Sequence, residues 1–268
     1  MAAIKEILGR WERGKGGRLW VAGIVLLGLV LAGGLGRLIG QYEARAAAAS
    51  EKLLPVYSVE RPDKKIALTF DAAAGAADTD ALLGILAVHQ AKATFFLCGC
   101  WMRNHPEETI RLYGAGHEIG NHGDAHLDPV GLSREKLTEE IEGAAAQMQA
   151  LLGVRPTLYR PAYGSYNNQV VSTARDMGYK VIQWSVDSLD WKELGLREMQ
   201  ERVLNHKDLG PGAILLFHND TKYTAQALDQ ILTELEQRGY EMVTVSELLL
   251  EEPTYLDHTG RQWPGERP

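Results

Sequence analysis

The chain has 268 residues, with 28 lysine or arginine and 35 aspartate or glutamate side chains, so its formal net charge is −7 at pH 7. The first 50 residues carry seven basic and three acidic side chains, which leaves 21 basic against 32 acidic side chains in the remainder. This acidic balance argues against nucleic acid or another anionic polymer as the main partner. It fits a neutral or partly cationic substrate better.

An uninterrupted apolar segment lies near the amino terminus. Residues 19–36 are 18 consecutive apolar or glycine residues, and as a helix they would extend about 27 Å, close to the thickness of a bilayer core. Five basic residues precede them against two acidic ones, which keeps the amino terminus in the cytoplasm. We therefore predict a basic cytoplasmic segment at 1–18 and a transmembrane anchor at 19–40, in a single-pass cell-membrane protein whose main domain is extracytoplasmic.

A cleaved signal peptide is the alternative to an anchor. The sequence Ala44-Arg45-Ala46 has the small-x-small form of a cleavage site, although it lies well beyond the end of the apolar run. In either case the exported part begins with a stalk or linker, which we place at 41–64.

Strand-like and helix-like segments alternate over residues 65–251, which we predict to be the main domain. Apolar β-branched and aromatic runs predict strands at 65–70, 92–98, 117–121, 157–161, 180–186, 212–217 and 241–245. Helical apolar spacing lies between them, around residues 82–86, 137–151 and 228–235. This alternation predicts a mostly parallel α/β sheet, either open or closed as a barrel. The tail, 252–268, is rich in Pro and Gly and is expected to be irregular.

Polar residues follow five of the predicted strands, where the chemistry of parallel sheets collects. They are Asp71, the pair His122 and His126, Arg160, the pair Asp187 and Asp190, and His218. Each alone has a structural explanation as a helix cap, a salt bridge or a core histidine. Five such placements in one domain predict an active site.

The residue types suggest particular roles. His122 and His126 are four apart, so on a helical turn both imidazoles would project from one face and share a cation. Arg160 has a planar fork suited to a carboxylate, and Asp190 can raise the basicity of His218 and fix its tautomer. A catalytic zinc site uses three protein ligands and an open position, and here two ligands are evident.

The two cysteines, Cys98 and Cys100, stand two residues apart in a predicted strand. A disulfide between them would close a strained ring. We interpret them as buried thiols that pack in the core.

Together these residues resemble the NodB-homology polysaccharide deacetylases, carbohydrate esterase family 4, over about residues 65–250. Four of that family's five ordered motifs are well matched, namely His122-x3-His126, Arg160-Pro161-Ala162-Tyr163-Gly164, Asp187-x-x-Asp190-Trp191 and Leu216-Phe217-His218. The resemblance implies a distorted (β/α) barrel of the NodB-homology type. It also implies metal-assisted hydrolysis of an N-acetyl group on an amino-sugar polysaccharide.

The resemblance assigns roles to the matched residues. Asp71 is the expected general base, oriented by Arg160, and His218 is the expected acid, tuned by Asp190. His122 and His126 are expected to hold Zn²⁺ or a similar divalent ion. The substrate-binding residues are expected to be Tyr163, whose backbone N–H would share the oxyanion, and Trp191, Leu216 and Asp187.

The first motif departs from the family at Ala72. The family usually has a second aspartate there, which is its third metal ligand, so the metal should bind more weakly. Asp124 or Asp78 could substitute for it. The altered loop resembles the sporulation-associated PdaB-like branch, which would make peptidoglycan the cell-wall glycan.

Two functions follow from these patterns. The first is a membrane-anchored, active N-deacetylase, which the retention of Asp71, Arg160, Asp190 and His218 favours. The second is a catalytically weak or inactive glycan-binding protein, which Ala72 favours.

Overall fold

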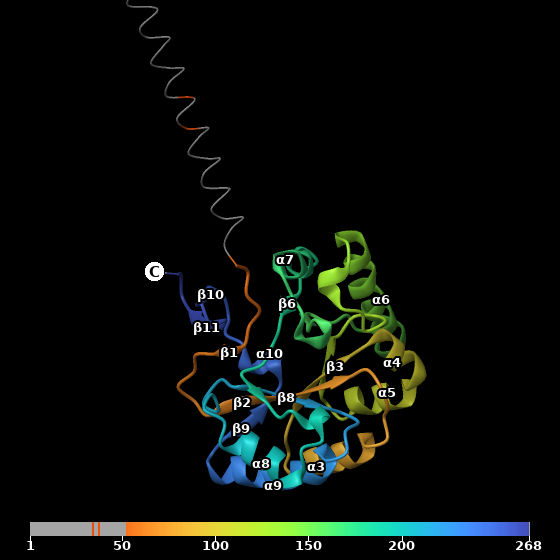
Figure 1. Ribbon diagram of the computed structural model, residues 1–268, viewed down its shortest axis with the longest axis vertical. Coiled ribbons are helices and arrows are strands. Elements are labelled where there is room, and N and C mark those ends of the chain that lie inside the picture. Colours follow the sequence, from red (N-terminus) through yellow and green to blue (C-terminus); the bar gives the residue numbers. More distant parts are fainter. Residues whose placement is uncertain (1–33, 35–36, 38–51, 268) are drawn as a thin grey trace, which may run out of the picture. The chain divides into compact units, whose positions relative to one another are not determined.

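The structure is a computed structural model that describes residues 34, 37 and 52–267. Nearly all of the predicted cytoplasmic segment and anchor lies outside the described residues, so the membrane topology stays a prediction. None of the helices in the described part is long and apolar enough to cross a bilayer. The fold set out below is that of the unit that begins at Leu53 (Figure 1).

One sheet of eight parallel strands holds the predicted main domain together. The strands are β2 (Lys65–Ala72), β3 (Ala93–Leu97), β4 (Glu118–Asn121), β5 (Leu158–Tyr159), β6 (Lys180–Val181), β7 (Val186–Asp187), β8 (Ile214–His218) and β9 (Glu241–Val243). Their order is β6-β5-β4-β3-β2-β8-β7, and β9 also pairs with β2. The predicted parallel α/β class is confirmed.

The predicted barrel is a curled half-barrel, because β6 and β7 stand at opposite ends of the strand order. The predicted strand 180–186 is split into β6 and β7, and the four residues between them pair in neither ladder. The chain before β2 contacts the sheet beside β6 and β8. Val56 forms a bridge with Ile182, next to β6, and Ser58 forms one with Ala213, next to β8.

Helices lie between the strands, as the alternation predicts (Figure 1). They are α3 (Thr79–Val88), α4 (Gly99–Asn104), α5 (Pro106–Gly114), α6 (Arg134–Leu152), α7 (Asn168–Asp176), α8 (Leu196–Leu204), α9 (Thr224–Gln237) and α10 (Val245–Leu248). The longest, α6, begins where the Ser133 side chain accepts a hydrogen bond from Lys136 N, and it ends at Gly153, which has a left-handed backbone. Both are favourable ends for a helix.

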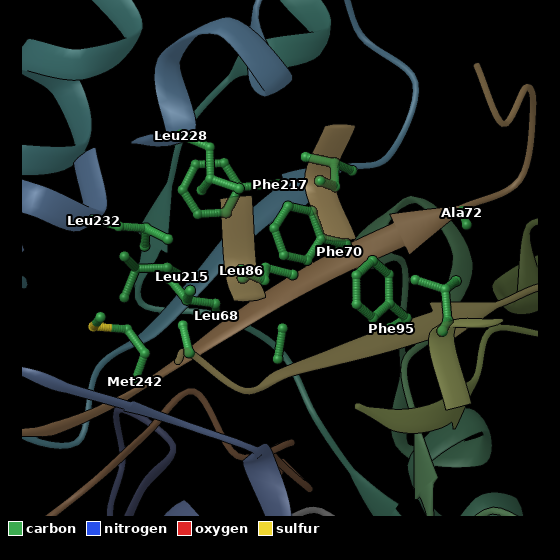
Figure 2. Packing of buried hydrophobic residues seen from close by; sticks show 14 of the residues in the cluster. Leu68, Phe70, Ala72, Leu86, Phe95, Leu215, Phe217, Leu228, Leu232 and Met242 are labelled. Atoms are coloured by element: carbon green, nitrogen blue, oxygen red, sulfur yellow. The ribbon is translucent and has the colours of Figure 1, made fainter. Parts of the chain in front are cut away.

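The two faces of β2 have different surroundings, because alternate residues of a strand point to opposite sides. Leu68, Phe70 and Ala72 belong to the core cluster that includes residues of α3 and α9, and Figure 2 shows them along the strand. The Phe70 ring stacks between Phe95, at a centroid distance of 4.9 Å, and Phe217, at 5.5 Å. The opposite face presents Thr69 and Asp71, so this packing fixes the direction of the candidate base.

The carboxyl-terminal tail is ordered, contrary to the expectation of an irregular segment. β10 (Thr254–Leu256) and β11 (Arg261–Pro264) form an antiparallel hairpin, and β11 pairs with β1 (Ser58–Val59), which lies in the predicted linker. Asp257 organises the turn, since its carboxylate accepts hydrogen bonds from Thr259 N at 2.8 Å and Trp263 Nε1 at 2.9 Å. Part of the linker and most of the tail therefore belong to the folded unit.

Truncating Phe95 should destabilise the fold strongly. The side chain is fully buried against Phe70, so Phe95→Ala should lower the free energy of unfolding by about 3–5 kcal/mol. Val88→Ala is the control, because Val88 is 77% exposed and a surface change should alter stability by less than about 0.5 kcal/mol. Urea unfolding followed by circular dichroism measures both. A loss below about 1 kcal/mol for Phe95→Ala would contradict the importance of this stack.

Candidate active site

A buried ion pair stands at the carboxyl end of β2. Arg160 Nη1 donates to Asp71 Oδ1 at 2.8 Å, and both side chains are almost completely withdrawn from solvent. Burial alone would raise the pKa of Asp71, but the charges of Arg160, His122 and His218 and the hydrogen bond from Arg160 together hold that pKa below its ordinary value. Asp71 is therefore an ionised acceptor in a dry environment, as a general base requires.

Three further groups fix the Arg160 guanidinium. Its Nη1 donates to Thr69 Oγ1 at 2.9 Å, its Nη2 donates to the Gln183 carbonyl at 3.1 Å, and its Cζ atom lies 4.1 Å from the Phe96 ring centre. Thr69 Oγ1 in turn donates to the Leu215 carbonyl at 2.6 Å. Sequence reasoning missed Thr69 and Gln183, because a threonine in a strand and a carbonyl carry no pattern of their own.

His122 and His126 meet in the loop after β4, with ring centroids 5.1 Å apart. The expected helical turn is wrong, since this loop is irregular and His126 has a positive φ of 55°. His122 Nδ1 donates to the Arg160 carbonyl at 2.8 Å, because that oxygen can only accept. The other nitrogen, Nε2, therefore carries the lone pair and lies 3.6 Å from Asp71 Oδ2.

Both imidazoles favour the neutral form that metals bind. Burial is the largest cause for each ring. It lowers the pKa of His122, and together with the nearby His122 it lowers the pKa of His126 to about 4. The loop thus presents two neutral nitrogen donors beside an ionised carboxylate.

A thiol completes this cluster. One ligand atom from each of Cys98, His122 and His126 lies within 4.8 Å of the others. Both cysteines are free thiols. Cys98 is buried as predicted, whereas Cys100 is only partly buried. The prediction that both merely pack in the core missed that Cys98 lies beside the two histidines. Two neutral imidazoles and a thiol suit Zn²⁺, so the residues present fit a divalent cation.

The two carboxylates considered as substitutes for position 72 make other contacts. Asp124 forms a two-point ion pair with Arg103, at 2.6 and 3.1 Å. Asp78 stands at the start of α3, where the main effects on its pKa are burial and the nearby Asp220, both of which raise it. Neither belongs to the cluster of three donors.

His218 lies beside Asp71, because the two residues are register partners of β8 and β2. The Asp190 carboxylate accepts hydrogen bonds from His218 Nδ1, His218 N and Thr224 Oγ1, each at 2.7 Å. Burial alone would lower the pKa of His218, but the hydrogen bond and charge of Asp190 outweigh it and raise that pKa. With Nδ1 engaged, Nε2 is the nitrogen available to a substrate.

The four predicted substrate-binding residues differ in exposure. Tyr163 is 68% exposed and Trp191 is 56% exposed, and the Tyr163 ring lies 4.4 Å from that of His126. Leu216 is buried, and Asp187 accepts a hydrogen bond from Leu189 N at 2.9 Å. Tyr163 also has a left-handed backbone, with φ of 60°, a strained conformation that concentrates at functional sites.

Comparison with known proteins identifies the family. A family model for polysaccharide deacetylases matches residues 58–182. The peptidoglycan-N-acetylglucosamine deacetylase of Bacillus cereus is 37% identical over 200 residues, which cover 72% of this chain and 92% of that protein. The chain belongs to the polysaccharide deacetylase family. The chain is also 34% identical to YlxY, an uncharacterized protein of Bacillus subtilis, over 196 residues that cover 73% of this chain and 60% of YlxY. It thus spans less than two thirds of YlxY.

Solved structures in the same family include a pseudoenzyme. BA3943 of Bacillus anthracis, described as a CE4 family pseudoenzyme, is 31% identical with a TM-score of 0.69, covering 73% of this chain and 68% of that one. A mutant of BA3943, described as having restored enzymatic activity, also has a TM-score of 0.69, at 32% identity, and the match covers 73% of this chain and 71% of the mutant. The family assignment is confirmed by these matches, and the PdaB-like branch stays a prediction.

Removing the charge of Asp190 should lower the pKa of His218. Asp190→Asn loses the charge-assisted hydrogen bond to Nδ1, so the ring should lose its proton at a lower pH than in the parent. Asp187→Asn is the graded control, since Asp187 contributes charge without bonding to this ring, and it should lower the pKa less. Histidine titration by NMR measures both. Equal shifts in the two variants would contradict the assigned pairing.

Proposed function

We propose that this protein is a metal-assisted N-deacetylase of an amino-sugar polysaccharide, with peptidoglycan as the glycan. The observation that carries the proposal is that two paired groups, Asp71 with Arg160 and His218 with Asp190, remain assembled, with Asp71 and His218 on adjacent strands. Keeping three buried polar groups and the partly buried His218 aligned is costly unless they have a use. The deacetylase relative of Bacillus cereus supports the reaction and the glycan.

Asp71 would accept the proton of the attacking water. Arg160 holds the carboxylate at one oxygen, Oδ1, which leaves Oδ2 directed toward His122 and the cluster of donors. Because Arg160 is itself held by Thr69 and Gln183, the base cannot rotate away from the site. The fixed direction removes much of the orientational cost of the reaction.

His218 would donate a proton to the leaving amine. Its pKa is raised by Asp190, so the ring carries a proton more readily than an isolated histidine, and Nε2 is its available end. Asp190 is in turn held by Thr224 and by the Trp191 N–H at 2.8 Å. The acid and the base therefore approach a bound N-acetyl group from neighbouring strands.

His122 and His126 would hold the divalent cation, proposed as Zn²⁺. When bound, such a cation supplies Lewis-acid polarisation of the acetyl carbonyl and makes water more acidic. The bond from His122 Nδ1 to the Arg160 carbonyl fixes which nitrogen faces the cation, an arrangement typical of metal-binding histidines.

Tyr163 and Trp191 would flank the sugar. Both rings are more than half exposed beside buried polar groups, as an open platform for a chain of sugars requires. The backbone N–H of Tyr163 would stabilise the oxyanion, and Leu216 and Asp187 would lie at the base of the acetyl pocket.

We also propose that residues 19–40 anchor the enzyme in the cell membrane with its catalytic domain on the extracytoplasmic side. The length of the apolar run and the basic residues before it support this orientation. A role in sporulation would follow from the resemblance of the first loop to the PdaB-like branch.

A second candidate function is glycan binding without catalysis. Ala72 supports it, because the family's third metal-binding carboxylate is missing at that position. The similarity to BA3943 supports it too, since that protein is described as a pseudoenzyme.

Acetate release tests the first function. The purified protein supplied with Zn²⁺ or Co²⁺ should release acetate from N-acetylglucosamine oligomers or peptidoglycan, and Asp71→Asn should slow the reaction by at least about 100-fold, because an amide cannot take up the proton. Glu139→Gln, an exposed partner of Lys136, should leave the rate unchanged. Absence of acetate from a folded protein under varied metals would refute the proposal.

Restoring the family carboxylate tests the second. If the protein is an active deacetylase, Ala72→Asp should change the existing rate, whereas a pure glycan-binding protein should gain activity that the parent lacks. Ala74→Asp is the matched control, since Ala74 is exposed in the same loop. Activity that appears only with Ala72→Asp, in a parent that still binds glycan, would establish the second function.

A further inference from the structure

We propose that Cys98 supplies the third protein ligand to the divalent cation, so that the site is built from one thiolate and two imidazoles. The assignment rests on the proposed metal-assisted function and specifies the ligand set that this chain uses. It is carried by the convergence of Cys98 with His122 and His126, and in the described part of the chain no other three cysteine, histidine or acidic side chains meet in this way.

The spacing of the three donors suits one small cation. Bond lengths of about 2.3 Å to sulfur and about 2.0–2.1 Å to nitrogen imply ligand atoms about 3.3–3.6 Å apart around a tetrahedral zinc ion. The three atoms already lie within 4.8 Å of one another. Side-chain rotations that shift the three ligand atoms by up to about one ångström would bring them to these distances without moving a strand.

Cys98 also stands next to the position that lost its carboxylate. Its backbone N–H donates to the Ala72 carbonyl at 3.1 Å, and the preceding residue, Leu97, is the register partner of Ala72. Both Ala72 and Cys98 are completely buried members of one core cluster. The third donor is therefore moved from the end of β2 to the end of β3, the adjacent strand.

The thiol has two weak contacts. It lies 3.5 Å from the His122 carbonyl and hydrogen-bonds to the Cys100 thiol, and a thiol is a weak donor. Coordination would break the S–H bond, form the sulfur–metal bond and release the proton to solvent. Asp71 stays with Arg160 and remains the base.

A thiolate ligand would change the choice of metal. Soft sulfur donors favour Zn²⁺ and Co²⁺ over Mg²⁺ and Mn²⁺, which prefer oxygen donors. This chain should therefore discriminate against Mg²⁺ and Mn²⁺ more strongly than a site with two histidines and a carboxylate.

Cobalt titration tests the ligand directly. The full chain, stripped of metal by a chelator and kept reduced without oxygen, is titrated with Co²⁺ while its absorption spectrum is recorded. We expect one equivalent to bind with a thiolate-to-cobalt charge-transfer band in the near ultraviolet.

The band should persist in Cys100→Ser and disappear in Cys98→Ser. Loss of a residue that only hydrogen-bonds to a metal ligand lowers metal affinity by about 10-fold to 100-fold. Cys98→Ser removes a ligand itself, so its affinity for Co²⁺ should fall by more than this.

Cys100 is the control, because it is the same residue type two positions away, is partly exposed and lies outside the three-donor cluster. Its thiol hydrogen-bonds to Cys98, and serine keeps a hydrogen-bonding group at that position. Thermal unfolding of Cys98→Ser and Cys98→Ala shows whether either variant is folded, and the spectrum of the folded one is used. Cobalt bound without the band, an unchanged affinity in the folded Cys98 variant, or no cobalt binding by the parent would each overturn the assignment.

Acetate release measured on the same samples separates this assignment from the proposed function. A charge-transfer band without acetate release would uphold Cys98 as a ligand while the deacetylase function fails. Acetate release by a cobalt-loaded protein that shows no band would do the reverse.

Discussion

The ion pair between Arg160 and Asp71 is the interaction on which the rest of the site depends. A fully buried guanidinium is costly unless it is paired and hydrogen-bonded, and here Asp71, Thr69 and Gln183 all accept from it. Removing one partner of such a pair typically costs about 3–5 kcal/mol. The same Arg160 residue orients His122 through its carbonyl, so one residue positions both the proposed base and a proposed metal-binding histidine.

The sheet explains why these groups meet. Thr69 and Asp71 share the inner face of β2, while Leu68 and Phe70 lock its outer face into the core. Register then places His218 beside Asp71 and Leu216 beside Thr69. The proposed acid and base are neighbours because their strands are parallel and in this register, and the stacked rings of Phe70, Phe95 and Phe217 support that register.

Sequence patterns predicted the strands and the strand-end residues well, since alternation and buried apolar runs are local properties. The same patterns could not show that 180–186 is interrupted or that the tail pairs with β1, because both depend on contacts with the segment around Val56 and Ser58. His122 and His126 were correctly expected to converge, yet a loop with a left-handed His126 brings them together. Cys98 carried no motif, and its nearness to the histidines arises from the pairing of β3 with β4.

The site keeps three converging donors, Cys98, His122 and His126, although position 72 is an alanine. Whether the proposed enzyme is active is a question for direct measurement. The most direct measurement is acetate release from peptidoglycan by the full chain as Zn²⁺ is added to the metal-free protein. Our account predicts a rate that rises to a plateau at one equivalent of zinc. A folded protein that binds the glycan and the zinc yet releases no acetate at any loading would contradict it.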